Sequence, residues 1–108
     1  IILTITPEQH PKAKELLRKV RELNLTDTII NVGSVPMPLV PSLYRQCDAL
    51  LMPTLLESFS GTYVEALFHN IPIFTTDADF SRGVCKNAAF YFDPHDENSI
   101  LKQIYTLI

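Results

Sequence analysis

The sequence predicts an α/β fold in which short strands alternate with helices around a mostly parallel sheet. Three observations indicate this class. Apolar, β-branched runs recur along the chain, amphipathic stretches lie between them, and Pro, Gly or Asn residues separate the two kinds of segment. Alternation of this kind is typical of βαβ units. We therefore expect a Rossmann-like, three-layer αβα arrangement with helices on both faces of the sheet.

The first half of the chain contains three predicted strands and two predicted helices. Residues 1–5 form an apolar run typical of a buried strand. Pro11 suits a first helical turn, and apolar side chains then recur at helical spacing at Ala13, Leu16, Leu17, Val20 and Leu23. A second strand is predicted at 28–32, a short helix beginning at Pro41, and a third strand at 48–52.

The second half continues the alternation. Asn70 follows a predicted helix at a position where helices often take a left-handed residue. The expected elements are a helix at 61–69, a strand at 71–75, a helical turn at 80–84, a strand at 88–92 and a helix at 99–108.

Composition limits the function classes. The chain has 108 residues, of which 46% are hydrophobic and 19% charged, so a single globular domain is expected over 1–108. A net charge of −3 argues against a nucleic-acid partner. Cys47 and Cys85 lack metal-ligand spacing, which favours two reduced thiols in a cytoplasmic protein. We expect the chain to be part of a longer protein, because it begins within a strand pattern and ends within a helical one.

The most informative segment joins the third strand to the next helix. Ser60 is a candidate N-cap, and the backbone N–H groups of Gly61 and Thr62 would be free at the helix start. Such a terminus attracts anions, whereas Glu57 and Glu65 on either side suit sugar hydroxyls. Phosphate and hydroxyls on one ligand suggest a nucleotide-sugar. The plainer alternative is that both carboxylates are solvated and Ser60 is an ordinary cap.

This segment, together with its flanks, resembles a known family. Residues 54–66 are similar to the E-x7-E motif of the retaining GT-B glycosyltransferases of family four. The flanking matches occur in the family's order and at normal spacing, at Gly33-Ser34-Val35, Leu43-Tyr44, Cys47-Asp48-Ala49, Ile71-Pro72-Ile73 and Tyr91-Phe92-Asp93-Pro94.

The resemblance implies a role for each matching residue. Glu57, the candidate catalytic residue, would contact the donor sugar, and Glu65 would hold the ribose hydroxyls. The donor would be a UDP-, GDP- or ADP-sugar, with neither cofactor nor metal. The other implied donor-binding residues are Ser60, Gly61 and Thr62 near the sugar and diphosphate, and Gly33, Ser34 and Val35 near the base. The family usually has E-x-F-G, whereas Gly61 lies one position later here.

The resemblance also implies what lies outside this segment. The parent enzyme would transfer a hexose-type sugar, with retention, to a glycan or lipid-linked acceptor, with peripheral association at the inner membrane face. An N-terminal acceptor domain and a first strand–helix unit carrying an Arg and a Lys would be missing, which predicts an inactive fragment. Strands 1–5 and 48–52 would then pair directly, or another chain would fill the gap by self-association.

Alternative readings remain. A non-catalytic, regulatory sugar-nucleotide-binding module would share the motif, and a receiver-type domain or another GT-B enzyme fits fewer residues. A metal site at Asp77 and Asp79 is less favoured than a plain loop, and His10, His69 and His95 lack ligand spacing. Arg82 is expected in a surface salt bridge rather than at a phosphate.

Overall fold

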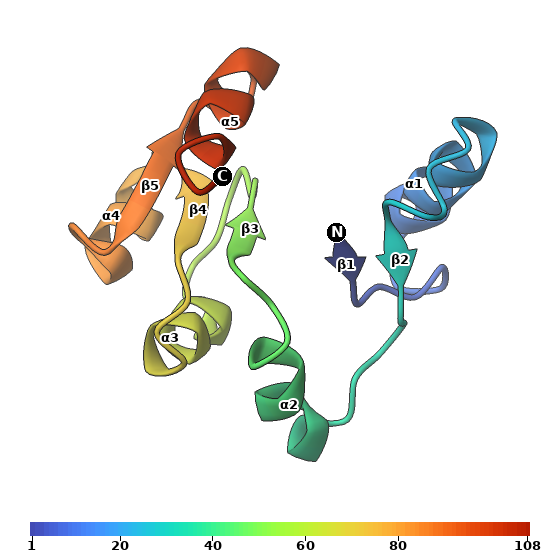
Figure 1. Cartoon of the computed structure of the whole chain (residues 1–108), viewed down its shortest axis with the longest axis horizontal. Helices are drawn as coiled ribbons and strands as arrows, with labels where there is room; N and C mark the ends of the chain where they lie inside the picture. Colours follow the sequence, from blue (N-terminus) through green and yellow to red (C-terminus); the bar gives the residue numbers. More distant parts are fainter. The chain divides into compact units, whose positions relative to one another are not determined.

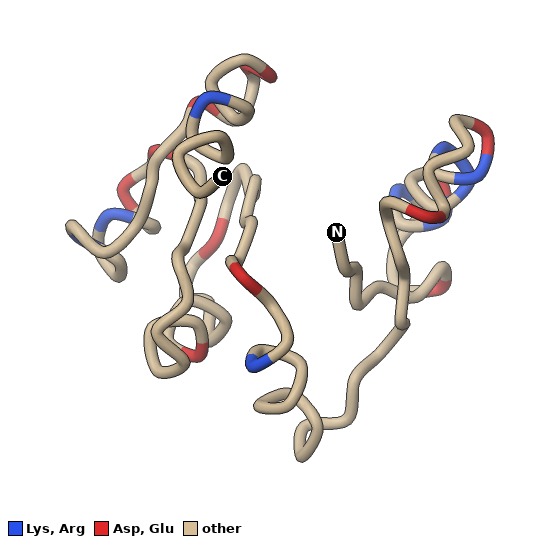
Figure 2. The backbone as a smooth tube through the Cα atoms, viewed as in Figure 1, with Lys and Arg blue, Asp and Glu red and all other residues tan.

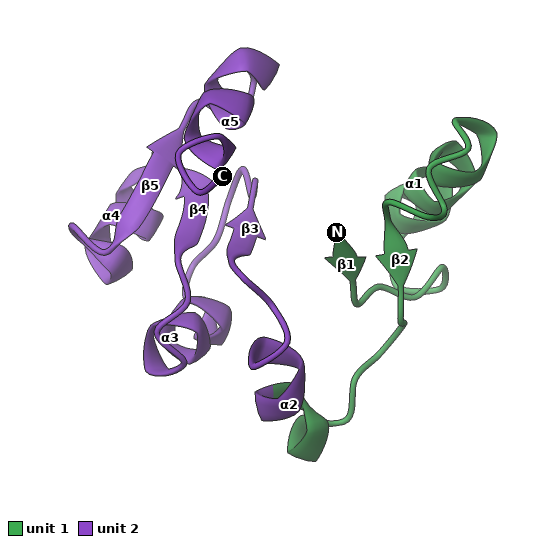
Figure 3. Ribbon diagram, in the orientation of Figure 1, with its two compact units in different colours: residues 1–40 green, residues 41–108 purple.

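The computed structural model describes residues 1–108 and is an α/β structure in which all paired strands are parallel. It divides into two compact units, residues 1–40 and 41–108 (Figure 3). The first contains β1 (Ile2–Leu3), α1 (Pro11–Glu22), β2 (Ile30–Asn31) and the 3-10 helix η1 (Met37–Leu39). Helix α2 (Val40–Tyr44) begins at the boundary, and the second unit continues with β3 (Leu50–Met52), α3 (Gly61–Phe68), β4 (Ile73–Thr76), α4 (Asp79–Cys85), β5 (Ala89–Phe92) and α5 (Glu97–Ile104). None of these helices combines the length and apolar character that crossing a bilayer requires.

The first unit is a two-stranded sheet with one long helix. Strands β1 and β2 pair with Ile2 opposite Ile30, and the Asn31 side chain extends the pairing by bonding both the N–H and the C=O of Ile5. Pro11 occupies the first turn of α1, where its lack of a backbone N–H costs no helical hydrogen bond. The His10 side chain caps the helix by accepting from the Lys12 N–H at 3.1 Å. The helix predicted from the periodicity is thereby confirmed.

The basic residues of the first unit gather on α1 (Figure 2). They are exposed, and two of them form i,i+4 ion pairs within the helix, Arg18 with Glu22 and Lys19 with Glu15. Pairs of this kind stabilise a helix by only a few tenths of a kcal/mol. This side of α1 is therefore a solvated face.

The second unit is a three-stranded sheet in the order β3-β4-β5. Helices α3 and α4 connect successive strands and contact each other on one face, while α5 packs on β5 at the other face (Figure 1). The core under α3 and α4 contains Tyr63, Ala66, Ile73 and Cys85, none more than 2% exposed. On the α5 face, Phe74 stacks on Phe90 with ring centroids 4.9 Å apart. The three-layer arrangement predicted from the alternation is present in this unit.

Several boundary predictions were wrong. The strand expected at 1–5 covers only Ile2–Leu3 and is not buried, since Ile1 is 64% exposed and Ile2 41%. It has a partner, β2, along one edge only. Strands β1 and β3 belong to different units, and whether strands 1–5 and 48–52 pair directly or another chain fills the gap stays a prediction. The helix expected to reach residue 108 ends at Ile104, where i,i+3 turns replace the helical bonds.

Other local predictions were confirmed. Asn70 adopts φ 55° immediately after the α3 C-cap, the left-handed conformation expected there. The predicted helical turn at 80–84 is the centre of α4. Both Cys47 and Cys85 are free thiols, and burial raises the pKa of the Cys85 thiol.

Candidate functional site

The predicted site is built at the start of α3, beyond the carboxyl end of β3. Ser60 occupies the N-cap with extended backbone (φ −115°, ψ 116°), but its side chain makes no capping hydrogen bond. The N–H groups of Gly61 and Thr62 donate to no group of the chain. Two oriented backbone donors are thus free at the positive end of the helix, which is the arrangement that binds an anion.

A buried hydrogen-bond chain fixes this end of α3 over the sheet. The Tyr63 hydroxyl donates to Thr75 Oγ1 at 2.7 Å, and Thr75 in turn donates to the Met52 carbonyl at 3.1 Å. Tyr63 is 1% exposed and Thr75 is fully buried. Burial raises the pKa of Tyr63, so the phenol keeps the proton that this bond requires. The first turn of α3 is therefore held against the carboxyl ends of β3 and β4.

Glu65 lies one helical turn beyond Gly61, half-buried, and one of its carboxylate oxygens is already engaged. The Tyr44 hydroxyl lies 3.1 Å from Glu65 Oε2 and 3.3 Å from the Thr62 carbonyl. Burial is the main cause, and the neighbouring Glu65 carboxylate the second, of a Tyr44 pKa that lies well above the usual range. Glu65 Oε1 has no partner in the chain. Tyr44 thus fixes the carboxylate through one oxygen and leaves the other oxygen free.

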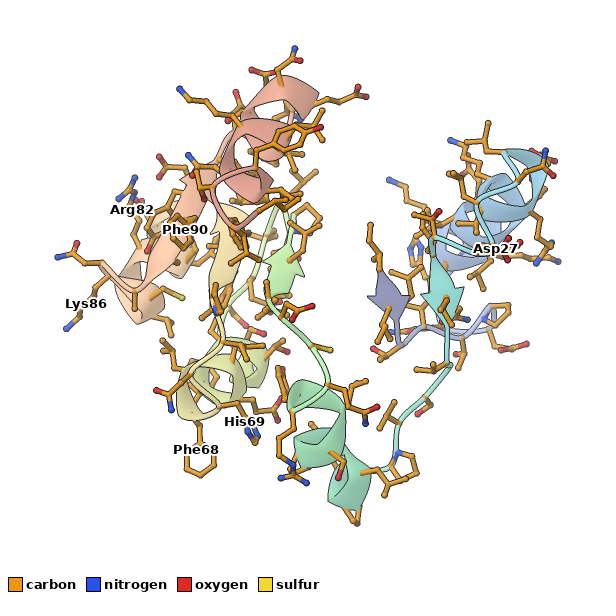
Figure 4. The ribbon with its side chains drawn as sticks, viewed as in Figure 1. Asp27, Phe68, His69, Arg82, Lys86 and Phe90 are labelled. Atoms are coloured by element: carbon orange, nitrogen blue, oxygen red, sulfur yellow. The ribbon has the colours of Figure 1, made fainter.

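Tyr44 is itself held by aromatic packing. Its ring stacks on His69, with centroids 5.2 Å apart and planes 11° apart. Figure 4 shows His69 extending from the end of α3 toward α2, while the neighbouring Phe68 points outward. The stack connects α2 with both ends of α3, because Tyr44 also reaches Thr62 and Glu65.

Glu57 lies on the loop between β3 and α3. Its side chain is half-buried and makes no hydrogen bond or ion pair within the chain. It is near enough to Tyr63 to contribute to the raised pKa of that phenol. The same loop exposes three apolar side chains, Leu55, Leu56 and Phe59. The junction thus presents a free carboxylate, free amides and uncovered apolar surface on one loop.

The predicted base-binding loop belongs to the other unit. Gly33 has φ 70°, a backbone conformation that favours glycine, and its N–H approaches Asn31 Oδ1 at 3.4 Å. Ser34 and Val35 follow it before η1. The role of these three residues at a nucleotide base stays a prediction.

Arg82 forms the surface ion pair that the sequence favoured. Its Nε and Nη2 donate to Asp77 Oδ1 and Oδ2 at 2.5 and 2.8 Å, and its guanidinium lies 4.2 Å from the Tyr91 ring centroid. Arg82 points outward from α4 (Figure 4). This hydrogen bond holds the pKa of Asp77 below its ordinary value.

Sequence reasoning missed the part that Tyr44 plays in orienting Glu65. The sequence placed Tyr44 on a short helix and in the Leu43-Tyr44 match to the family, without a role for its hydroxyl. Its contact with Glu65 joins positions 21 apart, so no local periodicity indicates it. The available signals were the Leu43-Tyr44 match and the chemistry of tyrosine, whose ring packs while its hydroxyl seeks a hydrogen-bond partner.

Comparisons with known proteins place the chain among sugar transferases. The family model described as "Glycosyl transferases group 1" matches residues 5–108. The O-antigen chain mannosyltransferase RfbU of Salmonella typhimurium strain LT2 is 31% identical over 87 residues, which are 81% of this chain and 25% of that protein. The 2-deoxystreptamine glucosyltransferase of Streptomyces kanamyceticus is 32% identical over 63 residues, 58% of this chain and 16% of that protein. The chain therefore spans a quarter or less of the length of these relatives.

A solved structure shows the fold. Sucrose-phosphate synthase from Thermosynechococcus elongatus superposes with a TM-score of 0.82 and 17% identity, covering 98% of this chain and 28% of that one. The maize (Zea mays) sucrose-phosphate synthase is 31% identical over 100 residues, 80% of this chain and 9% of that protein. The Rossmann-like, GT-B type of α/β fold predicted from the sequence is confirmed by the structural match.

Proposed function

The chain belongs to the glycosyl transferases group 1 family, and from this premise we propose that it is the donor-binding part of a nucleotide-sugar-dependent glycosyltransferase. The observation that carries the proposal is the α3 start. Free N–H groups at Gly61 and Thr62 lie one turn from Glu65, whose carboxylate Tyr44 orients. A helical pitch of about 5.4 Å suits a diphosphate at the helix tip with a ribose diol beside it.

Each predicted residue at the α3 start and on the loop before it then has a defined task. The Gly61 and Thr62 amides, with the Ser60 junction, bind the diphosphate and stabilise charge on the leaving phosphate. Glu65 accepts the ribose hydroxyls through its free oxygen. Glu57, unpaired on its loop, accepts hydroxyls of the transferred sugar and positions its anomeric carbon. Both carboxylates bind and orient the donor.

The finer features of the reaction are part of the same proposal. The donor is a UDP-, GDP- or ADP-hexose bound without metal, the transfer proceeds with retention, and the acceptor is a glycan or lipid-linked sugar. The O-antigen mannosyltransferase among the relatives supports a place in polysaccharide synthesis. The acceptor site and the cations that neutralise the diphosphate lie outside this segment. Two free thiols favour the cytoplasm as the compartment.

Binding of nucleotides to the 108-residue chain tests the donor site. Titration of the 15N-labelled chain with UDP, GDP and ADP should shift the amide resonances of Gly61, Thr62 and Glu65 for one of the three bases. Glu65→Gln should weaken that binding about tenfold, the effect of one charge-assisted hydrogen bond. Glu97→Gln, the same change at the start of α5, is the control. Saturable shifts confined to other residues would contradict the proposal.

The alternative is a regulatory module that binds sugar-nucleotides without catalysis. The distinguishing experiment uses the longer parent protein with a panel of nucleoside diphosphate sugars. Sugar transfer that is lost in Glu57→Ala and Glu65→Ala supports the enzyme. Binding without turnover by the parent supports the module.

A further inference from the structure

The His69 ring lies outside the residues assigned to the donor and is packed against aromatic neighbours. His69 is the C-cap of α3 and is half-buried. Its ring is parallel to that of Tyr44 and edge-on to that of Phe68, with centroids 5.2 and 5.3 Å away. It forms no ion pair within the chain. Because stacked rings favour a narrow set of mutual orientations, this contact constrains Tyr44.

The stack closes a circuit of contacts around Glu65. The His69 backbone N–H donates to the Glu65 carbonyl at 3.0 Å. The His69 ring stacks on Tyr44, and the Tyr44 hydroxyl returns to Glu65 Oε2 at 3.1 Å. The backbone and the carboxylate of one glutamate are therefore joined through two rings from two helices. A change at residue 69 is transmitted to the carboxylate through Tyr44.

The Tyr44 hydroxyl has one proton and two acceptors within reach. Glu65 Oε2 lies 3.1 Å away and the Thr62 carbonyl 3.3 Å away. The carboxylate is the stronger acceptor because it is charged. The phenolic O–H prefers the plane of its ring, so the orientation of that ring decides which acceptor receives the proton. Donation to Thr62 would leave Glu65 without its donor.

Helix α2 does not fix the Tyr44 ring by itself. It has five residues, Val40–Tyr44, none of them buried, and Tyr44 is the last. A helix this short is unstable on its own, because its nucleation is costly. Side-chain contacts must hold its end, and those of Tyr44 are the margin of the core and the His69 ring.

We propose that His69 is a positioning residue of the donor site. By stacking on Tyr44 it directs the Tyr44 hydroxyl to Glu65 Oε2, and this bond holds Glu65 Oε1 for a hydroxyl of the ligand. The inference rests on the proposed function, because that hydroxyl belongs to the ribose of the nucleotide. His69 itself makes no contact with the ligand.

The free chain provides the first test. With tyrosine 13C-labelled at Cζ, the Tyr44 resonance, assigned by its loss in Tyr44→Phe, reports whether the hydroxyl donates to a carboxylate. Glu65→Gln should shift this resonance, and His69→Gln should shift it in the same direction. His69→Phe, which keeps a ring for stacking, should leave it near its wild-type position. A resonance that His69→Gln leaves in place, or that both His69 variants shift equally, would overturn the proposal.

A double variant removes the contribution of the His69 ring current to this shift. The ring current acts on Tyr44 whether residue 65 is Glu or Gln, whereas the bond to a carboxylate exists only with Glu. Adding His69→Gln to Glu65→Gln should therefore shift the resonance less than adding it to the wild type. Equal shifts in the two backgrounds would refute a link to Glu65.

Calorimetry with the nucleoside diphosphate that the chain binds measures the effect on the ligand. His69→Gln should weaken binding several-fold, by no more than Tyr44→Phe does, and His69→Phe should restore it. In the Tyr44→Phe background His69→Gln should have little further effect, since its route to Glu65 is already lost. Equal losses in both backgrounds would show that His69 acts only on the structure. The matched control, His95→Gln at an exposed loop, should not change affinity.

The two measurements separate this inference from the proposed function. If no nucleoside diphosphate binds, the proposed function fails, while the Tyr44 resonance still reports whether His69 positions Glu65. If nucleotides bind and the Tyr44 resonance does not respond to residue 69, only the role of His69 fails.

Discussion

The hydrogen-bond chain beneath the α3 start allows a quantitative test of how the site is held. Tyr63 donates to Thr75 in a buried bond, and Thr75 donates to the Met52 carbonyl in a part-buried one. Tyr63→Phe removes only the first bond, since Thr75 keeps its own acceptor. The free energy of unfolding should fall by about 1 kcal/mol, the net value of one hydrogen bond.

Thr75→Val has a larger effect because it leaves groups unpaired. The Tyr63 hydroxyl, on a side chain 1% exposed, loses its acceptor, and the Met52 carbonyl loses its donor. A cost of about 2–3 kcal/mol is expected. Adding Tyr63→Phe to Thr75→Val removes the orphaned hydroxyl. The double variant should therefore be about 1 kcal/mol more stable than Thr75→Val alone.

Urea unfolding followed by circular dichroism measures all four proteins, with m-values compared to check that each unfolds in the same way. In thermal scans, 1 kcal/mol corresponds to roughly 4–8 °C for domains of this size. Tyr105→Phe, at a tyrosine that is 69% exposed, is the matched control and should change stability by less than about 0.5 kcal/mol. Additive losses in the double variant would refute the proposed chain of donors.

Three further predictions follow from other contacts. Tyr44→Phe should weaken nucleotide binding several-fold in calorimetry, because Glu65 loses the donor that orients it; unchanged affinity would mean that Tyr44 only packs. The bond from Arg82 lowers the pKa of Asp77, so its stabilisation is present above the ordinary carboxyl pKa of about 3.9 and lost as pH falls below it. The Tm difference between the wild type and Arg82→Gln should accordingly be small at pH 7 and become smaller in acid, where only the contact of Arg82 with the Tyr91 ring remains, and a difference that does not decrease on acidification would disprove this linkage. Asn70 has φ 55°, a conformation that alanine adopts at a cost and glycine does not, so Asn70→Ala should lower the free energy of unfolding by about 1 kcal/mol and Asn70→Gly should not lower it. Equal effects of the two variants in urea unfolding would contradict this backbone argument.

Local chemistry made the helices predictable. Pro11 and the 3.6-residue periodicity placed α1, and the Ser60-Gly61 pair placed the start of α3. The strands were harder, because a strand extends only as far as its neighbour pairs with it. The apolar run at residues 1–5 has the composition of a buried strand, yet only Ile2 and Leu3 pair with β2.

In the candidate site too, features set by local sequence were predictable and features set by contacts between distant residues were not. Glu57 and Glu65 are visible in the sequence because they flank a recognisable junction. The orientation of Glu65 by Tyr44 is not, since it depends on a contact between separate helices.

The position of α5 in chain order has a consequence for synthesis on the ribosome. Phe74 and Phe92 are each 2% exposed and lie on the sheet face that α5 packs against, whereas α3 and α4 occupy the other face. All three strands emerge before residues 97–104 do. Until that helix is made, the nascent sheet presents a bare aromatic layer, which is the kind of surface that chaperones bind and that drives aggregation.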